Sequence, residues 1–138
     1  MAEPMQILLA EDNAEDANLL KEVLLDTKIA HVLNVVDDGV DALAYLRQLG
    51  RFAQAPRPDL LFLDLNMPMM NGFEVLEELR EGGPRGLPIV VLTVSDDQEE
   101  IVKAMELAMN YYIRKPVELA QLTELLVLVN EMWRTPRI

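Results

Sequence analysis

The chain has 138 residues, 51% of them apolar and none of them cysteine, and its formal net charge at pH 7 is −12. This length and composition suit one compact domain with a sizeable core, and they exclude disulfides and thiolate metal sites. The acidic balance argues against non-specific binding to nucleic acid, and no apolar stretch approaches the roughly 18 residues of a membrane span. We therefore expect a single cytoplasmic domain, residues 1–138 with a core of about 6–133, that binds neither nucleic acid nor a membrane.

Short apolar runs alternate with longer, partly polar segments along the chain. The short runs predict five strands, at residues 6–10, 32–36, 59–64, 89–93 and 111–114. The longer segments predict five helices, at about 13–26, 39–49, 71–80, 95–109 and 118–133. Because the strands are almost continuously apolar, as in parallel strands buried on both faces, the alternation indicates a doubly wound α/β fold.

Residues of the type that caps helices stand where three of these helices begin. Asn13 precedes the first helix, and Asn71 with Glu74 has the spacing of a capping box before the third. Ser95 and Gln98 have the same spacing before the fourth helix. Each cap predicts where the chain leaves the preceding loop and the helix starts.

Polar side chains stand where four of the predicted strands end. Glu11 and Asp12 follow the first strand, Asp64 ends the third, Thr93 ends the fourth, and Lys115 comes directly after the fifth. In open parallel sheets, ligands bind outside the carboxyl ends of the strands. We therefore expect three carboxylates, one hydroxyl and one ammonium group to meet at one edge of the sheet.

The three carboxylates predict a cation site. Each residue alone has an ordinary explanation as a helix cap, strand residue or surface lysine, but clustered carboxylates repel each other unless a cation lies between them. Oxygen ligands with added water suit Mg²⁺, with Mn²⁺ as the alternative. The single histidine, His31, lies at the start of the second strand, so we expect it to be structural and not a metal ligand.

Taken together, these motifs resemble the receiver domains of two-component response regulators. Glu11-Asp12, the segment from Asp64 to Gly72, Thr93 and Lys115-Pro116 occur in the family's order, with 29 residues from Asp64 to Thr93 and 22 from Thr93 to Lys115. The resemblance covers about residues 6–129 and implies a flavodoxin-like fold with five parallel strands in the order 2-1-3-4-5, flanked by five helices. The loop at 55–59 resembles that of single-domain regulators that partner bacterial and cyanobacterial phytochromes.

The resemblance implies a phosphoryl-acceptor site built around Asp64. In this family the corresponding aspartate takes a phosphoryl group from the phosphohistidine of a sensor histidine kinase. Asp12, Asp64 and the backbone carbonyl of Asn66 would bind Mg²⁺ directly, and Glu11 would act through a water molecule. The chain would then be a signalling switch that catalyses only its own phosphorylation and dephosphorylation, and not an enzyme with a separate substrate.

The resemblance also implies how other residues of the domain would respond to phosphorylation. Lys115 would neutralise a second phosphoryl oxygen, and the Thr93 hydroxyl would bond a third. Tyr112 stands where the family places a rotating aromatic coupled to that hydroxyl, although a half-buried strand tyrosine is the plain alternative. The bond between Lys115 and Pro116 would be cis.

Two other functions remain open from the sequence. A haloacid-dehalogenase-type phosphatase also uses an aspartate nucleophile and Mg²⁺, but it needs a second aspartate two residues later, where this chain has Asn66. A degenerate receiver would bind partners without being phosphorylated, and the retained site residues argue against it. Val94 departs from the small residue usual after Thr93, and Val117 from the usual phenylalanine, but neither removes a reacting group.

The last helix carries more apolar residues than one buried stripe needs. We expect Leu119, Leu122, Leu126 and Val129 to cover the sheet. The remaining apolar residues of this region would form a homodimer face, with a different partner protein as the alternative. That face comprises Val102, Met109, Tyr111, Leu125, Leu128 and Met132. Because the chain ends shortly after this helix, we expect no output domain and a response through protein contacts.

Overall fold

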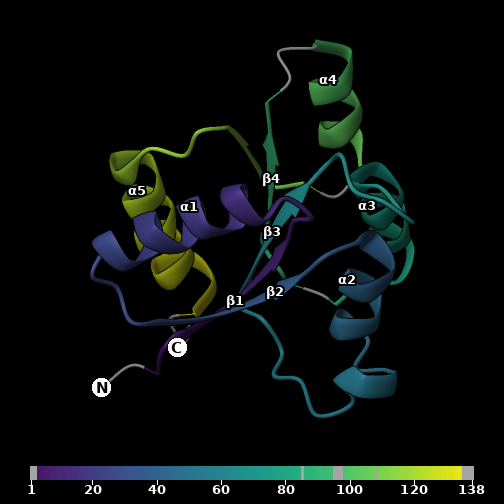
Figure 1. The fold of residues 1–138 in the computed structure, drawn as a ribbon, viewed down its shortest axis with the longest axis horizontal. Coiled ribbons are helices and arrows are strands. Elements are labelled where there is room, and N and C mark those ends of the chain that lie inside the picture. The colour runs from purple at the N-terminus through teal and green to yellow at the C-terminus, as the bar shows by residue number, and fades with distance from the viewer. Residues whose placement is uncertain (1–2, 85, 95–97, 108, 135–138) are drawn as a thin grey trace.

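The computed structural model describes residues 3–84, 86–94, 98–107 and 109–134, and its strands form one parallel sheet. The strand order is β2-β1-β3-β4-β5, which confirms the predicted doubly wound α/β fold (Figure 1). The strands are β1 (Met5–Ala10), β2 (His31–Val36), β3 (Leu60–Asp64), β4 (Ile89–Thr93) and β5 (Tyr111–Arg114). The α-helices are α1 (Ala14–Asp26), α2 (Gly39–Leu46), α3 (Gly72–Gly82), α4 (Gln98–Glu106) and α5 (Leu119–Val129).

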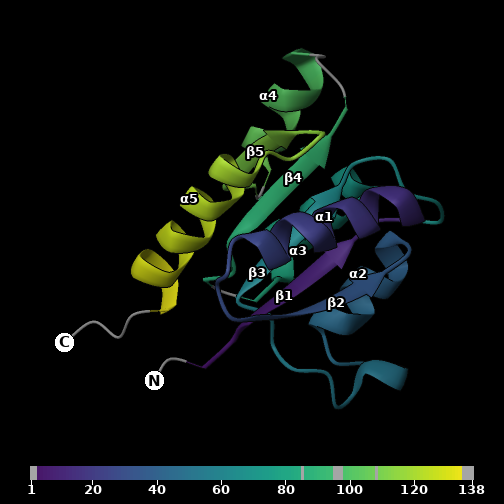
Figure 2. The ribbon, with the colours of Figure 1, turned by 60° about the vertical axis from the view of Figure 1, so that its left-hand side comes forward.

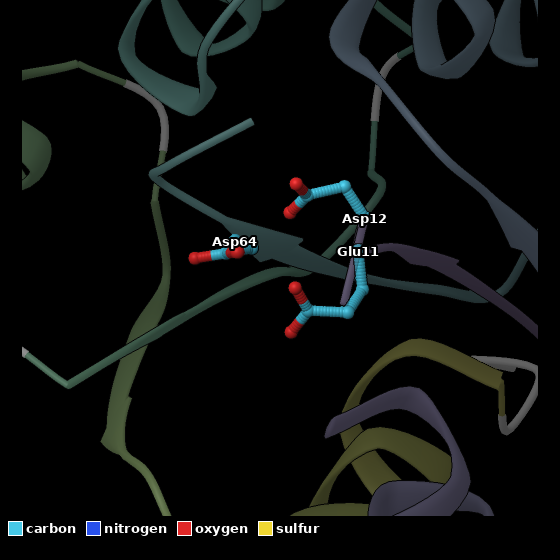
Figure 3. A group of neighbouring side chains, drawn as sticks. All are labelled: Glu11, Asp12 and Asp64. Carbon is cyan, nitrogen blue, oxygen red and sulfur yellow. The ribbon is translucent and has the colours of Figure 1, made fainter. Parts of the chain in front are cut away.

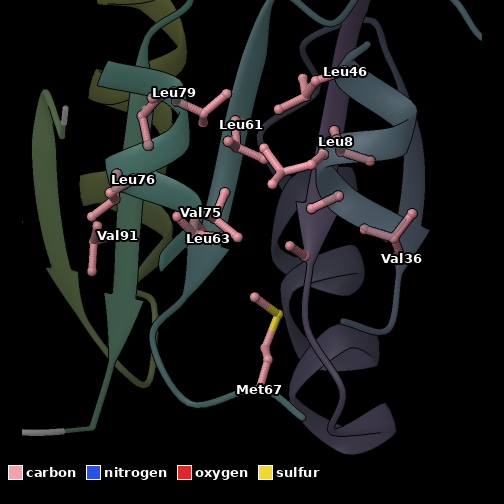
Figure 4. Close-up of a cluster of buried hydrophobic side chains, with 14 of the residues drawn as sticks. Leu8, Val36, Leu46, Leu61, Leu63, Met67, Val75, Leu76, Leu79 and Val91 are labelled. Atoms are coloured by element: carbon pink, nitrogen blue, oxygen red, sulfur yellow. The ribbon is translucent and has the colours of Figure 1, made fainter. Parts of the chain in front are cut away.

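The helices form two layers, one on each face of the sheet. Helices α1 and α5 lie side by side on one face, and α2 and α3 lie on the other (Figures 1 and 2). Successive strand residues point to opposite faces, so the central strand supplies both cores. Leu61 and Leu63 pack under α2 and α3 (Figure 4). Leu60 and Phe62 pack under α1 and α5.

Caps start the helices where the sequence predicts them. The Asn13 side chain accepts a hydrogen bond from the Asp16 amide at 3.1 Å and begins α1. In α3, Asn71 and Glu74 form a complete capping box. The predicted cap at Ser95 lies outside the described residues, and α4 is described from Gln98.

Two helices end earlier than predicted. Helix α2 ends at Leu46, not at residue 49, because Gln48 adopts a left-handed conformation with φ of 55° that a right-handed helix cannot continue. A short 3₁₀ turn, η1 (Gly50–Phe52), follows it. Helix α4 ends at Glu106 and not near residue 109. At this end the Leu107 amide bonds the Ala104 carbonyl, three residues back, in place of the four-residue spacing of an α-helix.

The last helix changes its geometry near its end. Helix α5 ends at Val129 and continues as a π-helix, η2 (Asn130–Arg134). The Trp133 ring packs edge-on against Tyr111 of β5, with the ring centroids 6.2 Å apart. Arg134 donates to the Glu3 carbonyl and so holds the end of the helix against the start of the chain. None of the helices in the described part of the chain has the length and apolarity needed to cross a bilayer.

Candidate functional site

Three carboxylates meet at the carboxyl edge of the sheet. Oxygen atoms of Glu11, Asp12 and Asp64 all lie within 4.8 Å of one another, at the ends of β1 and β3 (Figure 3). Glu11 and Asp64 are buried, at 3% and 5% exposure, whereas Asp12 is exposed. The group therefore has two carboxylates shielded from water and one open to it.

The strand register produces this meeting. Strands β1 and β3 are paired in parallel with Ala10 opposite Leu63, so the residues that follow each strand emerge next to each other. The Glu11 amide bonds the Val36 carbonyl at 3.0 Å, which extends the β1–β2 ladder to the site. The Asn66 amide donates to Asp64 Oδ1 at 3.2 Å and orients that carboxylate.

Two glycines let the backbone close around the loop after β3. A Cβ atom on Gly72 would lie 2.6 Å from the Asp64 carbonyl oxygen, and one on Gly39 would lie 2.2 Å from the Met70 carbonyl oxygen. Both distances are far below van der Waals contact, so a side chain at either position forces the loop to move. The sequence pattern assigned Gly39 only to the start of a helix, and the close approach is visible only in the fold.

Lys115 is bonded to acidic side chains from two elements. Its Nζ donates to Glu11 Oε1 at 2.5 Å and to Asp16 Oδ2 at 2.9 Å, and it lies 3.7 Å from Asp64 Oδ2. The Lys115–Pro116 peptide bond is cis. The Lys115 amide bonds the Thr93 carbonyl at 2.8 Å, which joins the ends of β4 and β5. The structure therefore places the ammonium group beside the acidic cluster.

Burial and neighbouring charges shift two pKa values in the site. Burial, followed by the hydrogen bond and negative charge of Glu11, raises the pKa of Asp64 from 3.8 to about 7, against the opposing effect of Lys115. Burial alone would lower the pKa of Lys115, but hydrogen bonds to Asp16 and Glu11 raise it above its ordinary value. The metal-free site therefore keeps the ammonium charged, and below about pH 7 it holds a proton on Asp64 that an ordinary aspartate would have lost.

Thr93 and Tyr112 lie on neighbouring strands. Thr93 is 1% exposed at the end of β4, one residue beyond the Leu92 that pairs with Asp64. Tyr112 is half-buried in β5 opposite Val91 and packs against the core under α2 and α3. Thr93 is thus at the site, and Tyr112 lies farther back along the sheet on the adjacent strand.

His31 lies where the sequence predicts it, whereas Asp16 makes a contact that the sequence did not predict. His31 begins β2, at the opposite end of the strand from the acidic edge, and its Nδ1 lies 2.8 Å from the Ile29 carbonyl oxygen. Asp16, which the sequence analysis did not single out, bonds Lys115 in the fold. The sequence signal that could have suggested Asp16 is its place in the first turn of the helix that directly follows Glu11 and Asp12.

The expected dimer face needs correction at α5. Leu125 is 6% exposed and belongs to the core, so it adds almost no area to a surface stripe. The buried stripe consists of Leu122, Leu125, Leu126 and Val129, whose spacing of three, one and three residues is that of one helix face. Leu119, one turn earlier at the first position of α5, is 45% exposed and does not cover the sheet as expected.

The rest of that face remains accessible to different degrees. Val102 and Met132 are each 50% exposed, whereas Met109, Tyr111 and Leu128 are half-buried. Met105, which the sequence did not suggest, is 64% exposed on the same helix as Val102.

The chain is similar to known proteins over almost its whole length. The family model of the response regulator receiver domain matches residues 7–127. Response regulator Rcp1 of Synechocystis sp. is 37% identical over 131 residues, which cover 94% of this chain and 89% of Rcp1. The crystal structure of the phosphorylated cyanobacterial phytochrome response regulator RcpA matches with a TM-score of 0.80 at 38% identity, over 99% of this chain and 98% of that one. The Mn²⁺-bound form of Rcp1 matches with a TM-score of 0.78 at 36% identity, over 98% of each chain.

Proposed function

The chain belongs to the response regulator receiver domain family, and from this premise we propose that it is a phosphorylation switch whose acceptor is the Asp64 carboxylate. The observation that carries the proposal is the placement of Asp64: it ends β3, is 5% exposed, and has Glu11 and Asp12 within 4.8 Å. A phosphorylated form of RcpA supports the same chemistry here.

In the proposed reaction, a carboxylate oxygen of Asp64 attacks the phosphorus atom of a phosphohistidine. The new oxygen–phosphorus bond forms as the phosphorus–nitrogen bond to the donor imidazole breaks. The Lys115 ammonium, 3.7 Å from Asp64 Oδ2, is near enough to neutralise a phosphoryl oxygen, and the buried Thr93 is our choice for a further contact. A movement of Thr93 with Tyr112 would then bias the switch toward its active form.

The residues at this edge fit a divalent cation. The cluster supplies three carboxylates and no nitrogen or sulfur ligand from the described residues, a donor set that suits Mg²⁺ or Mn²⁺. Asp12, Asp64 and the Asn66 carbonyl would hold the ion, with Glu11 acting through water. When bound, the ion neutralises charge on the acidic cluster and on the phosphoryl group. A Mn²⁺-bound form of Rcp1 supports this assignment.

We expect the metal-free protein to bind one Mg²⁺ ion, which tests the proposed site directly. Calorimetric titration should saturate in the millimolar range, and Asp12→Asn should weaken binding by about tenfold or more because it removes a ligand. Glu15→Gln makes the same change of charge on an exposed residue of α1 and should bind as the wild type does. The absence of binding to the wild type at tens of millimolar Mg²⁺ would contradict the metal assignment.

In this proposal a sensor histidine kinase donates the phosphoryl group, and that kinase is a phytochrome. RcpA is described as a cyanobacterial phytochrome response regulator, and another similar structure, at 34% identity and a TM-score of 0.82, is a bacteriophytochrome response regulator. These similarities, over 99% of this chain in both cases, support a light-sensing partner. The proposal places the reaction in the cytoplasm.

The remaining apolar surface supports a homodimer through α4, β5 and α5. We define this face by Val102, Met109, Tyr111, Leu128 and Met132. Leu128 and Tyr111 line a surface hollow of about 190 Å³. Val102 on α4 and Met132 on the π-helical continuation of α5 are each 50% exposed. Such patches usually mark contact surfaces, and a two-fold dimer is the commonest closed arrangement.

Leu128→Glu is expected to give a folded monomer. A carboxylate in the centre of an apolar contact would be buried without a partner, which costs more than the contact gains. Sedimentation velocity at micromolar concentration measures the change. Val127→Glu is the matched control, since Val127 is 43% exposed and does not line the hollow. A wild type that sediments as a monomer, with and without phosphorylation, would rule out the dimer.

A further inference from the structure

The Lys115 ammonium is already engaged before any phosphoryl group arrives. A lysine ammonium has three protons, and two of them are used on Glu11 and Asp16 at 2.5 and 2.9 Å. The nearest oxygen of Asp64 is 3.7 Å away, beyond hydrogen-bond distance. A phosphoryl group on Asp64 can therefore take the third proton, but it must share the ammonium with two carboxylates that already hold it.

The Asp16 side chain near the start of α1 bonds differently from Glu74, the residue at the same position of α3. Both helices begin with an asparagine cap followed three residues later by an acid, the capping-box arrangement. In α3, the Glu74 side chain accepts from the amide of its cap, Asn71. In α1, the Asn13 amide instead donates to Glu11 Oε2 at 3.4 Å, and the Asp16 carboxylate bonds Lys115. Asp16, the acid that would ordinarily accept a hydrogen bond from the amide of the cap residue, instead bonds Lys115 at the site.

The ion pair between Asp16 and Lys115 lies at the rim of an apolar pocket. Leu19 and Leu20 of α1, with Pro116 and Val117 after β5, are among the residues that line this pocket of about 200 Å³. The Lys115 side chain is 12% exposed and that of Asp16 is 38% exposed. The pair is thus screened from water on the lysine side and open to it on the aspartate side, so Asp16 can exchange its bond to Lys115 for bonds to water.

We propose that Asp16 is a positioning residue that competes with the phosphoryl group for Lys115, and that it thereby lowers the affinity of the acceptor site for a phosphoryl anion. The inference rests on the proposed function of Asp64 as acceptor. Asp16 is not one of the three clustered carboxylates, so a cation bound by Glu11, Asp12 and Asp64 leaves the bond between Asp16 and Lys115 in place. Its negative charge also repels an anion that binds nearby.

The test uses beryllofluoride, a phosphoryl analogue, together with Mg²⁺ on the full chain. Asp16→Asn keeps the size of the side chain but removes its charge, and it should bind the analogue about two- to fivefold more tightly than the wild type, the range expected for a partly exposed ion pair. Glu15→Gln removes one charge from the adjacent exposed residue and should leave the affinity unchanged. In ¹⁹F spectra of the bound analogue, Asp16→Asn should shift the fluorine that accepts from Lys115, and Glu15→Gln should not.

The outcomes separate this inference from the proposed function. Tighter binding and a shifted fluorine signal in Asp16→Asn alone support the competition. Unchanged or weaker binding in Asp16→Asn, with normal binding to the wild type, overturns the competition and leaves Asp64 as the acceptor. An equal gain in Glu15→Gln also overturns it, because a general charge effect then explains the result. A wild type that binds no beryllofluoride overturns both.

Discussion

Asp64→Asn is expected to make the metal-free protein more stable than the wild type at about pH 8, by about 1–4 kcal/mol in the free energy of unfolding. The physical reason is the pKa of Asp64, which burial and the neighbouring Glu11 raise from 3.8 to about 7. Above that pH the buried carboxylate is charged beside Glu11. This costs free energy in the folded state only, because the two groups are exposed to water in the unfolded chain. Asparagine fills the same space without the charge.

The effect has a defined direction with pH. Between about pH 4 and about pH 7 the folded protein keeps a proton on Asp64 that the unfolded chain has released. The folded state then binds more protons, so the stability of the wild type falls as the pH rises through this window. The advantage of Asp64→Asn should therefore be small near pH 4, grow through the window and level off above about pH 7.

Urea denaturation in the presence of a chelator measures this difference. Glu15→Gln, an exposed control, should follow the wild type at every pH. Added Mg²⁺ should narrow the gap, since a ligand that binds only the folded wild type stabilises it. A gap that stays constant from about pH 5 to about pH 8 would contradict the raised pKa of Asp64.

Gly72→Ala is expected to destabilise the fold by about 1–3 kcal/mol, the usual cost of overpacking, and to reduce phosphoryl acceptance. The new methyl group would lie 2.6 Å from the Asp64 carbonyl oxygen and 2.7 Å from the Leu65 Cα atom. Both atoms are backbone, so the loop carrying Asp64 must move. Thermal unfolding and phosphorylation by acetyl phosphate measure the two effects.

The same helix offers a matched control at its other end. Gly82 is the last residue of α3, and among the described residues nothing outside its own helix backbone and chain neighbours lies within 4 Å of a Cβ placed there. Gly82→Ala should therefore be neutral or stabilise the protein by up to about 1 kcal/mol through helix propensity. Equal destabilisation by Gly72→Ala and Gly82→Ala would show that the close approach to Asp64 is not the cause.

The sheet and its acidic edge could be predicted from the sequence because both depend on which residues follow one another over short stretches of the chain. Each strand is a short apolar run, and parallel pairing brings the strand ends to one edge. The residues that follow those ends, Glu11, Asp12 and Asp64, must then lie close together. The capping residues Asn13 and Asn71 likewise act within one helical turn, so the helix starts that they predict agree with the structure.

The remaining features depend on how elements are rotated against each other. The last helix has apolar residues on several faces, and the sequence alone does not decide which stripe meets the sheet, so Leu125 was assigned to the surface and Leu119 to the core. The bond between Asp16 and Lys115 joins residues 99 positions apart. It exists because α1 packs beside the turn after β5, a placement that no pattern within either segment specifies.

The measurement that tests the central proposal most directly is the intact mass of the protein after incubation with acetyl phosphate and Mg²⁺. The wild type should gain the mass of one phosphoryl group, and chelation of the metal should prevent the gain. Asp64→Asn should gain nothing under the same conditions. A phosphoryl group that still appears on Asp64→Asn, or a wild type that is never labelled by acetyl phosphate or by a histidine kinase, would contradict the assignment of Asp64 as the acceptor.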